Sequence, residues 1–171
     1  MKRKWAFGAG VVLVVLAALI ALALWYRAAH GMRTATGFAV GDATAHERVL
    51  IASQGSSFKD AMVREIIAHL KGHPVYVRVV DVSALPDVDP GAWTAVIVMH
   101  TWEIGKPDSF ARTFFERVGA QRKLIVVTTS GSGQEKVPGF DVISTASVIR
   151  ELPTPLGEVT RRLDGLLGAS R

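Results

Sequence analysis

The stretch RVLIASQGSSFKDAMVREIIAHLKGHPVYVRVVDV, residues 48–82, determines the class of fold that the sequence predicts. It opens and closes with short runs rich in Val and Ile, at 48–53 and 75–82, that are typical of buried strands. The intervening segment 57–71 places its apolar residues at helical spacing, and a glycine and a proline shortly after it end the helix. A strand, an amphipathic helix and a second strand in this order indicate an α/β protein with a parallel sheet.

The same alternation continues toward the end of the chain. Three further strands are predicted at 94–99, 124–129 and 142–145, with helices that open at Pro107 and at Thr154–Pro155. Only about a dozen residues separate the last two strands, so no helix is expected between them. The pattern predicts a doubly wound α/β sandwich around a five-stranded parallel sheet, in which ligands bind beyond the carboxyl ends of the strands.

The amino-terminal part of the chain differs in composition from the rest. After a basic tip at 1–5, residues 6–26 include no charged side chain, and about 20 apolar residues in a helix suffice to cross a bilayer. We therefore expect a single transmembrane helix at 6–26, and favour an uncleaved signal anchor over a cleaved signal peptide. A stretch rich in Gly, Ala and Thr at 27–46 is predicted to be a linker, and residues 47–171 to form the folded domain.

The distribution of charged residues indicates how the chain is oriented in a membrane and whether it binds nucleic acid. The chain carries a net charge of +5, and Lys2, Arg3 and Lys4 precede the apolar run. This arrangement favours a cytoplasmic amino terminus in a single-pass membrane protein, with the domain on the periplasmic or other extracytoplasmic side. The chain has no cysteine, which is compatible with an oxidising compartment. Basic residues do not interleave with aromatic ones, so nucleic-acid binding is not expected.

Polar and glycine-rich segments follow the first, third and fourth predicted strands, at the edge where this fold binds ligands. The first runs into a helix amino terminus, where N–H groups, hydroxyls and the helix dipole form a cradle for phosphate, to which Lys59 adds charge. The second contains a tryptophan that can stack on a flat heteroaromatic ligand, and the third is a turn. The candidate binding residues are Ser53, Gln54, Gly55, Ser56 and Ser57 in the first segment, Thr101, Trp102 and Gly105 in the second, and Ser130, Gly131, Ser132 and Gly133 in the third.

These segments resemble, in order and spacing, the binding loops of the flavodoxin family, over residues 47–169. Residues 101–105 read T-W-x-x-G, like the flavodoxin loop whose tryptophan covers the flavin ring, and 131–133 is similar to the loop at the other ring edge. The resemblance implies the strand order 2-1-3-4-5, FMN as the cofactor, and a phosphate held by the serine-rich segment. Together with the transmembrane helix expected at 6–26, it implies a membrane-anchored flavoprotein for electron transfer or quinone-type reduction, with the bilayer and a membrane quinone or redox partner protein as partners.

The chain also departs from the flavodoxin pattern. The phosphate segment is one residue shorter, the second stacking aromatic is absent, and Gln134 stands where the family has an aspartate. Ordinary structural interpretations stay open: the serines cap and turn the chain, and Trp102 packs over Phe110 or Phe114. The alternative to a flavoprotein is a flavodoxin-fold binding or scaffold module that has lost the flavin.

Overall fold

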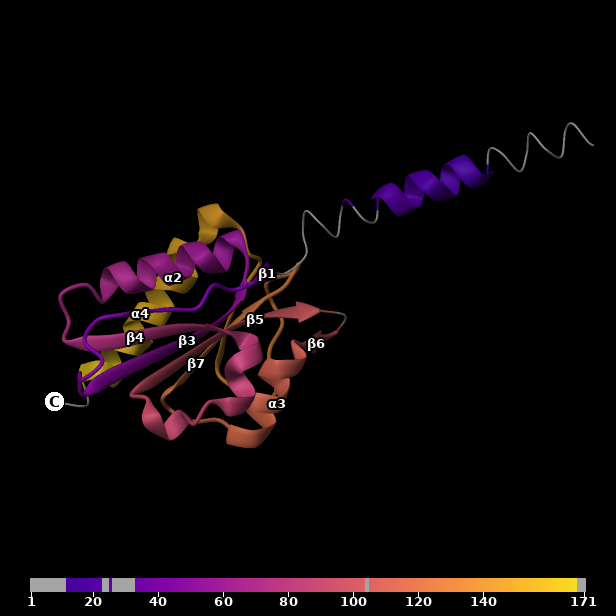
Figure 1. Ribbon diagram of the computed structural model, residues 1–171. Coiled ribbons are helices and arrows are strands. Elements are labelled where there is room, and N and C mark those ends of the chain that lie inside the picture. The colour runs from indigo at the N-terminus through magenta and orange to yellow at the C-terminus, as the bar shows by residue number, and fades with distance from the viewer. Residues whose placement is uncertain (1–11, 23–24, 26–32, 104, 169–171) are drawn as a thin grey trace, which may run out of the picture. The chain divides into compact units, whose positions relative to one another are not determined.

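The structure, a computed structural model, describes residues 12–22, 25, 33–103 and 105–168. The chain divides into two compact units, Met1–Met32 and Arg33–Arg171. In the first unit, residues 12–22 are helical (Figure 1). Among the described residues, no helix has both the length and the apolar character needed to cross a bilayer. Much of the predicted span 6–26 lies outside the described residues, so the membrane anchor stays a prediction.

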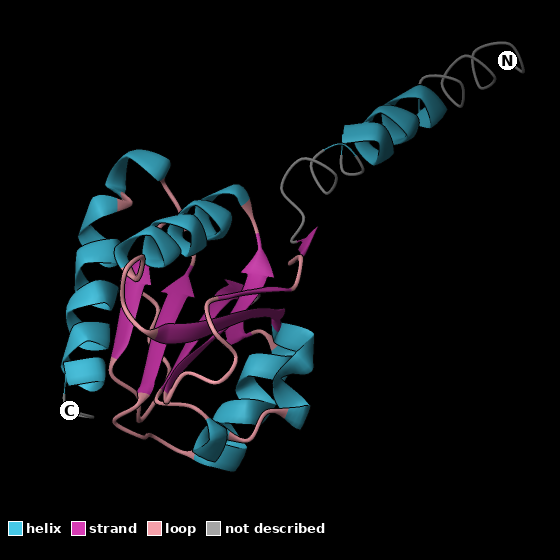
Figure 2. Ribbon diagram, turned by 60° about the vertical axis from the view of Figure 1, so that its left-hand side comes forward, coloured by secondary structure: helices cyan, strands magenta, loops and turns pink. Residues whose placement is uncertain are grey.

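An eight-stranded sheet forms the centre of the second unit (Figures 1 and 2). From one edge to the other, its main path consists of β2 (Phe38–Val40), β4 (Val75–Asp81), β3 (Glu47–Gly55), β5 (Ala95–Glu103), β7 (Leu124–Thr129) and β8 (Val142–Thr145). Two short strands lie off this path, β1 (Arg33–Thr34) beside β3 and β6 (Lys106–Pro107) beside β5. The predicted α/β class with a mostly parallel sheet is confirmed, whereas the predicted number of five strands is wrong.

All five strands that were predicted from the Val and Ile runs are present. They lie side by side and parallel as β4, β3, β5, β7 and β8, which is the expected order 2-1-3-4-5. Ser53 pairs with Met99, and Thr101 pairs with Thr129, so the carboxyl ends of β3, β5 and β7 meet at one edge of the sheet. β3 and β5 run further than predicted and replace parts of two expected loops with strand.

The three missed strands are antiparallel to their partners. Each has only two or three residues, too few to show the alternation that marks a strand, and β1 and β2 are wholly exposed. β1 and β2 lie inside the stretch 27–46 that was interpreted as a linker. That interpretation is wrong for residues 33–34 and 38–40, because backbone pairing with β3 and β4 orders them.

Helices cover both faces of the sheet (Figure 2). α2 (Ser57–His69) and α4 (Pro153–Gly168) lie on one face, while α3 (Ser109–Val118) and the 3-10 helix η1 (Val82–Asp87) lie on the other. Each face has its own buried apolar cluster. The remaining 3-10 turns are η2 (Pro90–Ala92) and η3 (Ile149–Glu151). The connection from β7 to β8, residues 130–141, contains no helix, as the short spacing predicted.

The ends of two helices differ from expectation. The helix predicted at 57–71 begins at Ser57 but ends at His69, and its capping residue is Ser56, whose hydroxyl accepts a hydrogen bond from the Lys59 N–H. Pro107 was expected to open a helix but lies in β6. α3 begins two residues later, where the Asp108 carboxylate accepts hydrogen bonds from two first-turn N–H groups. A proline is tolerated in β6 because a two-residue edge strand does not need every N–H.

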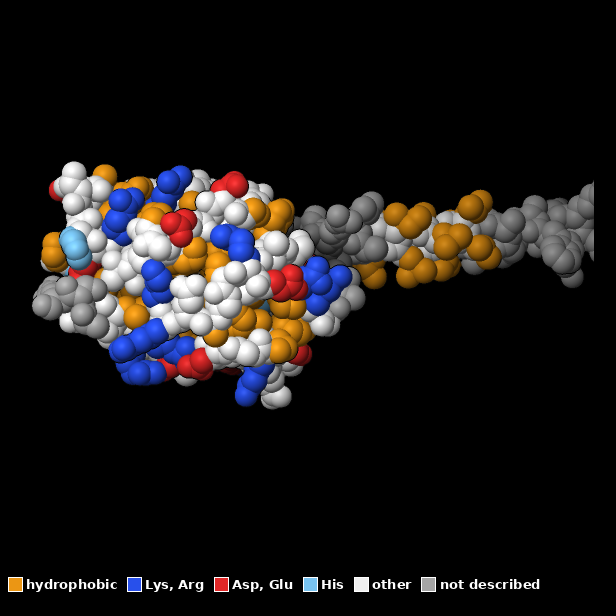
Figure 3. All heavy atoms as spheres, turned by 90° about the horizontal axis from the view of Figure 1, so that it is seen from below, with side chains coloured by type: hydrophobic (Ala, Val, Ile, Leu, Met, Phe, Trp, Pro, Cys, Tyr) orange, Lys and Arg blue, Asp and Glu red, His pale blue; other side chains and the backbone are white. Residues whose placement is uncertain are grey.

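The surface of the second unit mixes charges of both signs. On the face shown in Figure 3, Lys and Arg side chains lie among Asp and Glu side chains and apolar ones.

Candidate functional site

The structure brings the three predicted segments together at the carboxyl edge of the sheet. The strands that lead into them, β3, β5 and β7, are direct neighbours. A side-chain bridge connects the first two, because Gln54 Oε1 accepts a hydrogen bond from the Thr101 N–H at 2.8 Å. The Thr101 and Thr129 hydroxyls, 3.2 Å apart, connect the second and third. This edge is also the point at which the strand order reverses, the usual ligand site of the fold.

The first segment is more compact than expected. β3 continues to Gly55 and α2 begins at Ser57, so a single residue, Ser56, connects them. Ser53 is buried, and its hydroxyl lies 3.4 Å from the Gln54 carbonyl oxygen. Ser57 is exposed at the start of α2, and Gln54 and Ser56 are partly exposed. First-turn N–H groups have no acceptor within a helix; that of Lys59 already donates to the Ser56 hydroxyl, so an anion would bind through the others.

A close backbone contact leaves no room for a side chain at Gly55. This residue pairs with Arg33 of β1, and a Cβ atom at this position would lie 2.6 Å from the Arg33 carbonyl oxygen. The glycine therefore admits the backbone of the amino-terminal segment. Asp81 secures the same segment, since its Oδ2 accepts a hydrogen bond from the Ala35 N–H at 2.7 Å.

Trp102 lies on a strand rather than on a loop. It pairs with Pro107 in a hairpin between β5 and β6, and Gly105 in the turn has a φ of +75°. The indole is half-buried and packs against the apolar cluster that contains Phe114 and Phe115. The packing interpretation that the sequence left open is thus observed for Phe114, while Trp102 keeps part of its surface exposed.

The third segment satisfies much of its own hydrogen bonding. The Ser130 N–H donates to the Thr145 carbonyl oxygen at 3.1 Å. The Ser130 hydroxyl accepts from the Gly133 N–H at 2.9 Å, and the Ser132 hydroxyl accepts from the Gln134 N–H at 3.2 Å. Gly131 is the open position, because a Cβ atom there would have no neighbour within 4 Å. The segment therefore has a defined shape with one exposed glycine.

A lysine is buried beneath the three segments. Lys59 is 0% exposed, and its Nζ donates a hydrogen bond to Thr101 Oγ1 at 2.5 Å. Burial lowers the pKa of Lys59 to about 8, against the opposing effect of Glu103, Asp108 and Asp60. The expected surface charge beside a phosphate is thus a core residue. The sequence did contain a sign of this burial. Lys59 precedes Met62 by three residues and Val63 by four, a spacing that places it on the apolar side of α2.

A histidine next to this lysine is also buried. His100 is 0% exposed, its Nε2 lies 2.9 Å from Thr128 Oγ1, and its Nδ1 lies 3.3 Å from the Thr101 carbonyl oxygen. Burial lowers the pKa of His100 to about 4, so the ring is neutral at pH 7. Phe115 packs edge-on against it, at 5.6 Å between ring centroids. Sequence reasoning gave this residue no role, since a single histidine carries no pattern.

The residues divide into two groups when they are tested against FMN. Ser56, Ser57, Trp102 and Gly131 are accessible, and they provide hydroxyls and a helix start for a phosphate, a flat ring for stacking and space beside it. Ser53, Gly55 and Gly133 instead contact other parts of the chain. The accessible group fits FMN at the edge where the three segments meet.

Comparisons with known proteins locate the fold. No protein-family model and no curated protein matches the chain. Among solved structures, the metal-soaked flavodiiron core from Synechocystis is similar with a TM-score of 0.53 and 14% identity, over 74% of this chain and 37% of that chain. A mutant flavo di-iron protein from Thermotoga maritima matches with a TM-score of 0.42 and 12% identity, over 72% of this chain and 36% of that chain. The chain thus spans little more than a third of these proteins, and the first similarity shows a shared fold.

Within the described residues, no group of three or more His, Cys, Asp or Glu side chains is arranged to hold a metal ion.

Proposed function

We propose that the chain is a membrane-anchored, flavodoxin-like protein that binds FMN at the carboxyl edge of β3, β5 and β7 and serves in electron transfer or quinone-type reduction. The observation that carries the proposal is the meeting of three segments at this edge: the start of α2, the half-buried indole of Trp102 and the open turn at Gly131. Their order along the chain matches the resemblance to the flavodoxin family.

Each accessible residue has a role in this proposal. Ser56 and Ser57, with the first-turn N–H groups of α2, hold the phosphate. Trp102 covers one face of the ring, and the turn around Gly131 borders its edge. Lys59 places a positive charge beneath the site, and the neutral His100 keeps the neighbouring layer polar without adding charge. FMN supplies the one- and two-electron chemistry when bound, so no side chain has to act as acid or base.

The membrane anchor at 6–26 belongs to the same proposal. A helix at these residues would hold the domain, on the extracytoplasmic side, close to a membrane quinone or a redox partner protein. Tethering raises the local concentration of two partners without any new contact between them. A reporter fused after Arg171 tests the sidedness, since an enzyme that is active only outside the cytoplasm would report an extracytoplasmic carboxyl terminus.

The central experiment is a titration of the full chain, in uncharged detergent micelles, with FMN. Quenching of flavin fluorescence that saturates at one FMN per chain is the expected result. Trp102→Ala should weaken binding about tenfold, which corresponds to loss of one stacking contact. Trp93→Phe is the matched control, because Trp93 lies at the amino edge of the sheet against Tyr76 and Arg48. Unquenched fluorescence with the folded full chain would contradict FMN binding.

A second candidate function has its own observations. The pairing of Gly55 with Arg33 and the internal hydrogen bonds of Ser130 and Ser132 occupy groups that a flavin site would use. These contacts favour a binding or scaffold module that has kept the fold and lost the flavin. A colourless purified chain that leaves flavin fluorescence unchanged is the result that supports this alternative.

A further inference from the structure

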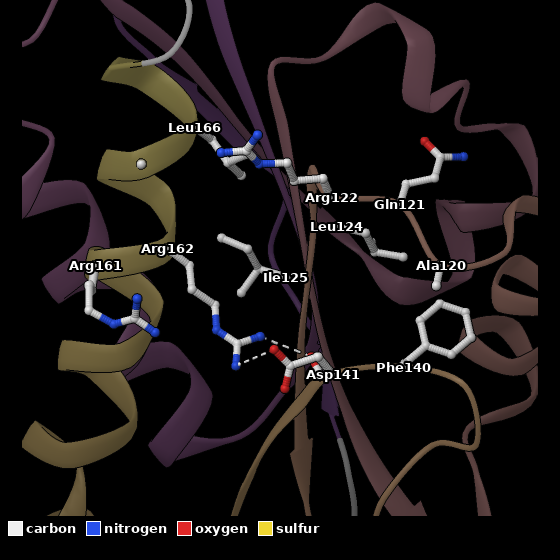
Figure 4. A pocket seen from close by; sticks show the side chains of 11 residues that line it. Ala120, Gln121, Arg122, Leu124, Ile125, Phe140, Asp141, Arg161, Arg162 and Leu166 are labelled. Carbon is white, nitrogen blue, oxygen red and sulfur yellow. Dashed lines mark hydrogen bonds and ion pairs between the residues drawn. The ribbon is translucent and has the colours of Figure 1, made fainter.

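A cavity of about 500 Å³ lies at the opposite, amino edge of the sheet. Figure 4 shows it between α4 and the starts of β7 and β8. Its volume is in the range of sites for small ligands. It shares no lining residue with the candidate FMN site. Its lining comes from three parts of the chain that the fold brings together. These are Arg122 and Leu124 at the start of β7, Phe140 and Asp141 just before β8, and Arg161 and Arg162 in α4.

The connection from β7 to β8, which borders the cavity at Phe140 and Asp141, has no helix. In a doubly wound fold a helix in such a connection would cover a face of the sheet. Here residues 130–141 return without one, and the half-buried Phe140 packs against Phe115 at 5.0 Å between ring centroids. The side chains Leu124, Ile125, Leu166 and Phe140 thus supply an apolar lining.

Three guanidinium groups surround this lining. Arg162 is fixed by Glu158 Oε1 at 2.7 Å and by the carboxylate and carbonyl oxygens of Asp141 at 3.0 and 2.9 Å. Arg161 donates two hydrogen bonds to Glu158, at 2.6 and 3.1 Å. The two acidic residues therefore hold two arginines in place, and among the described residues the third arginine has no acidic partner.

Arg122 is that third group. It is exposed, and Figure 4 shows it reaching from the β7 side toward α4. Within residues 33–103 and 105–168, no acidic side chain pairs with it. A guanidinium in a partly apolar hollow gains most from an anion, because its five donors match the oxygens of a carboxylate or phosphate.

We infer that this cavity binds a small organic anion, a carboxylate or phosphate carried on an apolar or aromatic body. The anionic group would pair with Arg122 and with the free edge of Arg161, while the body would lie on Phe140 and Leu166. The same chemistry is offered by a soluble aromatic phosphate and by the phosphate of a lipid headgroup. A volume of about 500 Å³ suits a small ligand of this kind.

The test is isothermal titration calorimetry on the full chain in uncharged detergent micelles. The probes are phenyl phosphate, inorganic phosphate, benzyl alcohol and dihexanoyl phosphatidic acid. Phenyl phosphate is expected to bind saturably at one per chain, and Arg122→Gln to weaken it about tenfold, the effect of one charge-assisted hydrogen bond. Arg112→Gln is the matched control, since this arginine is exposed on α3.

The probes separate the outcomes. Binding of phenyl phosphate above that of inorganic phosphate and benzyl alcohol supports the inference and indicates a soluble ligand. Tighter, Arg122-dependent binding of dihexanoyl phosphatidic acid supports it and indicates a lipid headgroup. Absence of saturable binding for every probe overturns it, as does equal binding by the folded Arg122→Gln variant. The readout involves no flavin, so it is independent of the result of the FMN titration.

Discussion

The Lys59 ammonium lies 2.5 Å from the Thr101 hydroxyl, and no part of the lysine side chain is exposed. A lysine is among the residues least often buried completely, because its charge loses the solvation that water provides. Here it lies directly beneath the edge at which β3, β5 and β7 end. Strongly shifted ionisable groups concentrate at functional sites, so the burial of Lys59 beneath this edge supports the site that we propose there.

The first prediction concerns the pH dependence of stability. Because the Lys59 pKa falls from 10.5 to about 8 on folding, the unfolded chain binds more protons between these pH values. The free energy of unfolding should therefore rise by about 3 kcal/mol from pH 8 to pH 10.5. Lys59→Met should remove this slope and gain about 1–3 kcal/mol at pH 7, where the burial cost is fully present. Urea unfolding at several pH values measures both effects, and the exposed Lys71→Met is the control.

The second prediction concerns the loss of stability at acid pH. The pKa of His100 falls from 6.5 to about 4 on folding, so its neutral form stabilises the native state above pH 6.5 and that contribution is lost toward pH 4. The free energy of unfolding should fall by about 3 kcal/mol over this range. His100→Gln should reduce the slope, whereas the exposed His46→Gln should keep it. Identical slopes in the two variants would contradict the assignment to His100.

The third prediction tests the contact between the amino-terminal segment and β3. Gly55→Ala places a methyl group 2.6 Å from the Arg33 carbonyl oxygen, so β1 has to move. We expect a loss of about 1–3 kcal/mol in stability and faster amide hydrogen exchange at residues 33–36. Gly131→Ala is the matched control, because its added methyl group would have no neighbour within 4 Å. Equal exchange rates in both variants would show that β1 does not depend on this glycine.

The fourth prediction separates two roles of Asp108. This residue caps α3 through the Phe110 and Ala111 N–H groups, and its charge also favours the protonated form of Lys59. Asp108→Ala should cost about 1 kcal/mol of stability through the lost cap. Asp108→Asn keeps a capping oxygen but removes the charge, so it should spare most of the stability and lower the Lys59 pKa further. Unfolding curves measure the first effect, and the midpoint of the alkaline stability rise measures the second.

The parallel core of the fold could be predicted from sequence because each of its strands leaves a direct pattern. Runs such as 94–99 and 124–129 are continuous in Val and Ile, and buried parallel strands require that composition. β1 and β2 could not be predicted in the same way. They are exposed and very short, and they are ordered by backbone pairing, which does not depend on side-chain type.

The place of the candidate residues in the fold was predictable from the sequence, but the depth at which they are buried was not. The strand order placed Ser56, Trp102 and Gly131 at one edge, and the structure has them there. Sequence patterns do not show how far a strand continues, so the extension of β5 through Trp102 and of β3 through Gly55 was missed. The burial of Lys59 was missed because a lysine next to a glycine-rich turn is normally solvated.

The pairing of Arg33 with Gly55 also has a mechanical consequence. A pull on the chain from its amino-terminal side would enter the second unit at Arg33, and Gly55 and the first turn of α2 would be the first groups to feel it. β1 is held to β3 by only two residue pairs, Arg33 with Gly55 and Thr34 with Gln54, so this pairing would break before that of the longer strands. Such a pull would thereby loosen the serines at the start of α2 before it disturbs the longer strands.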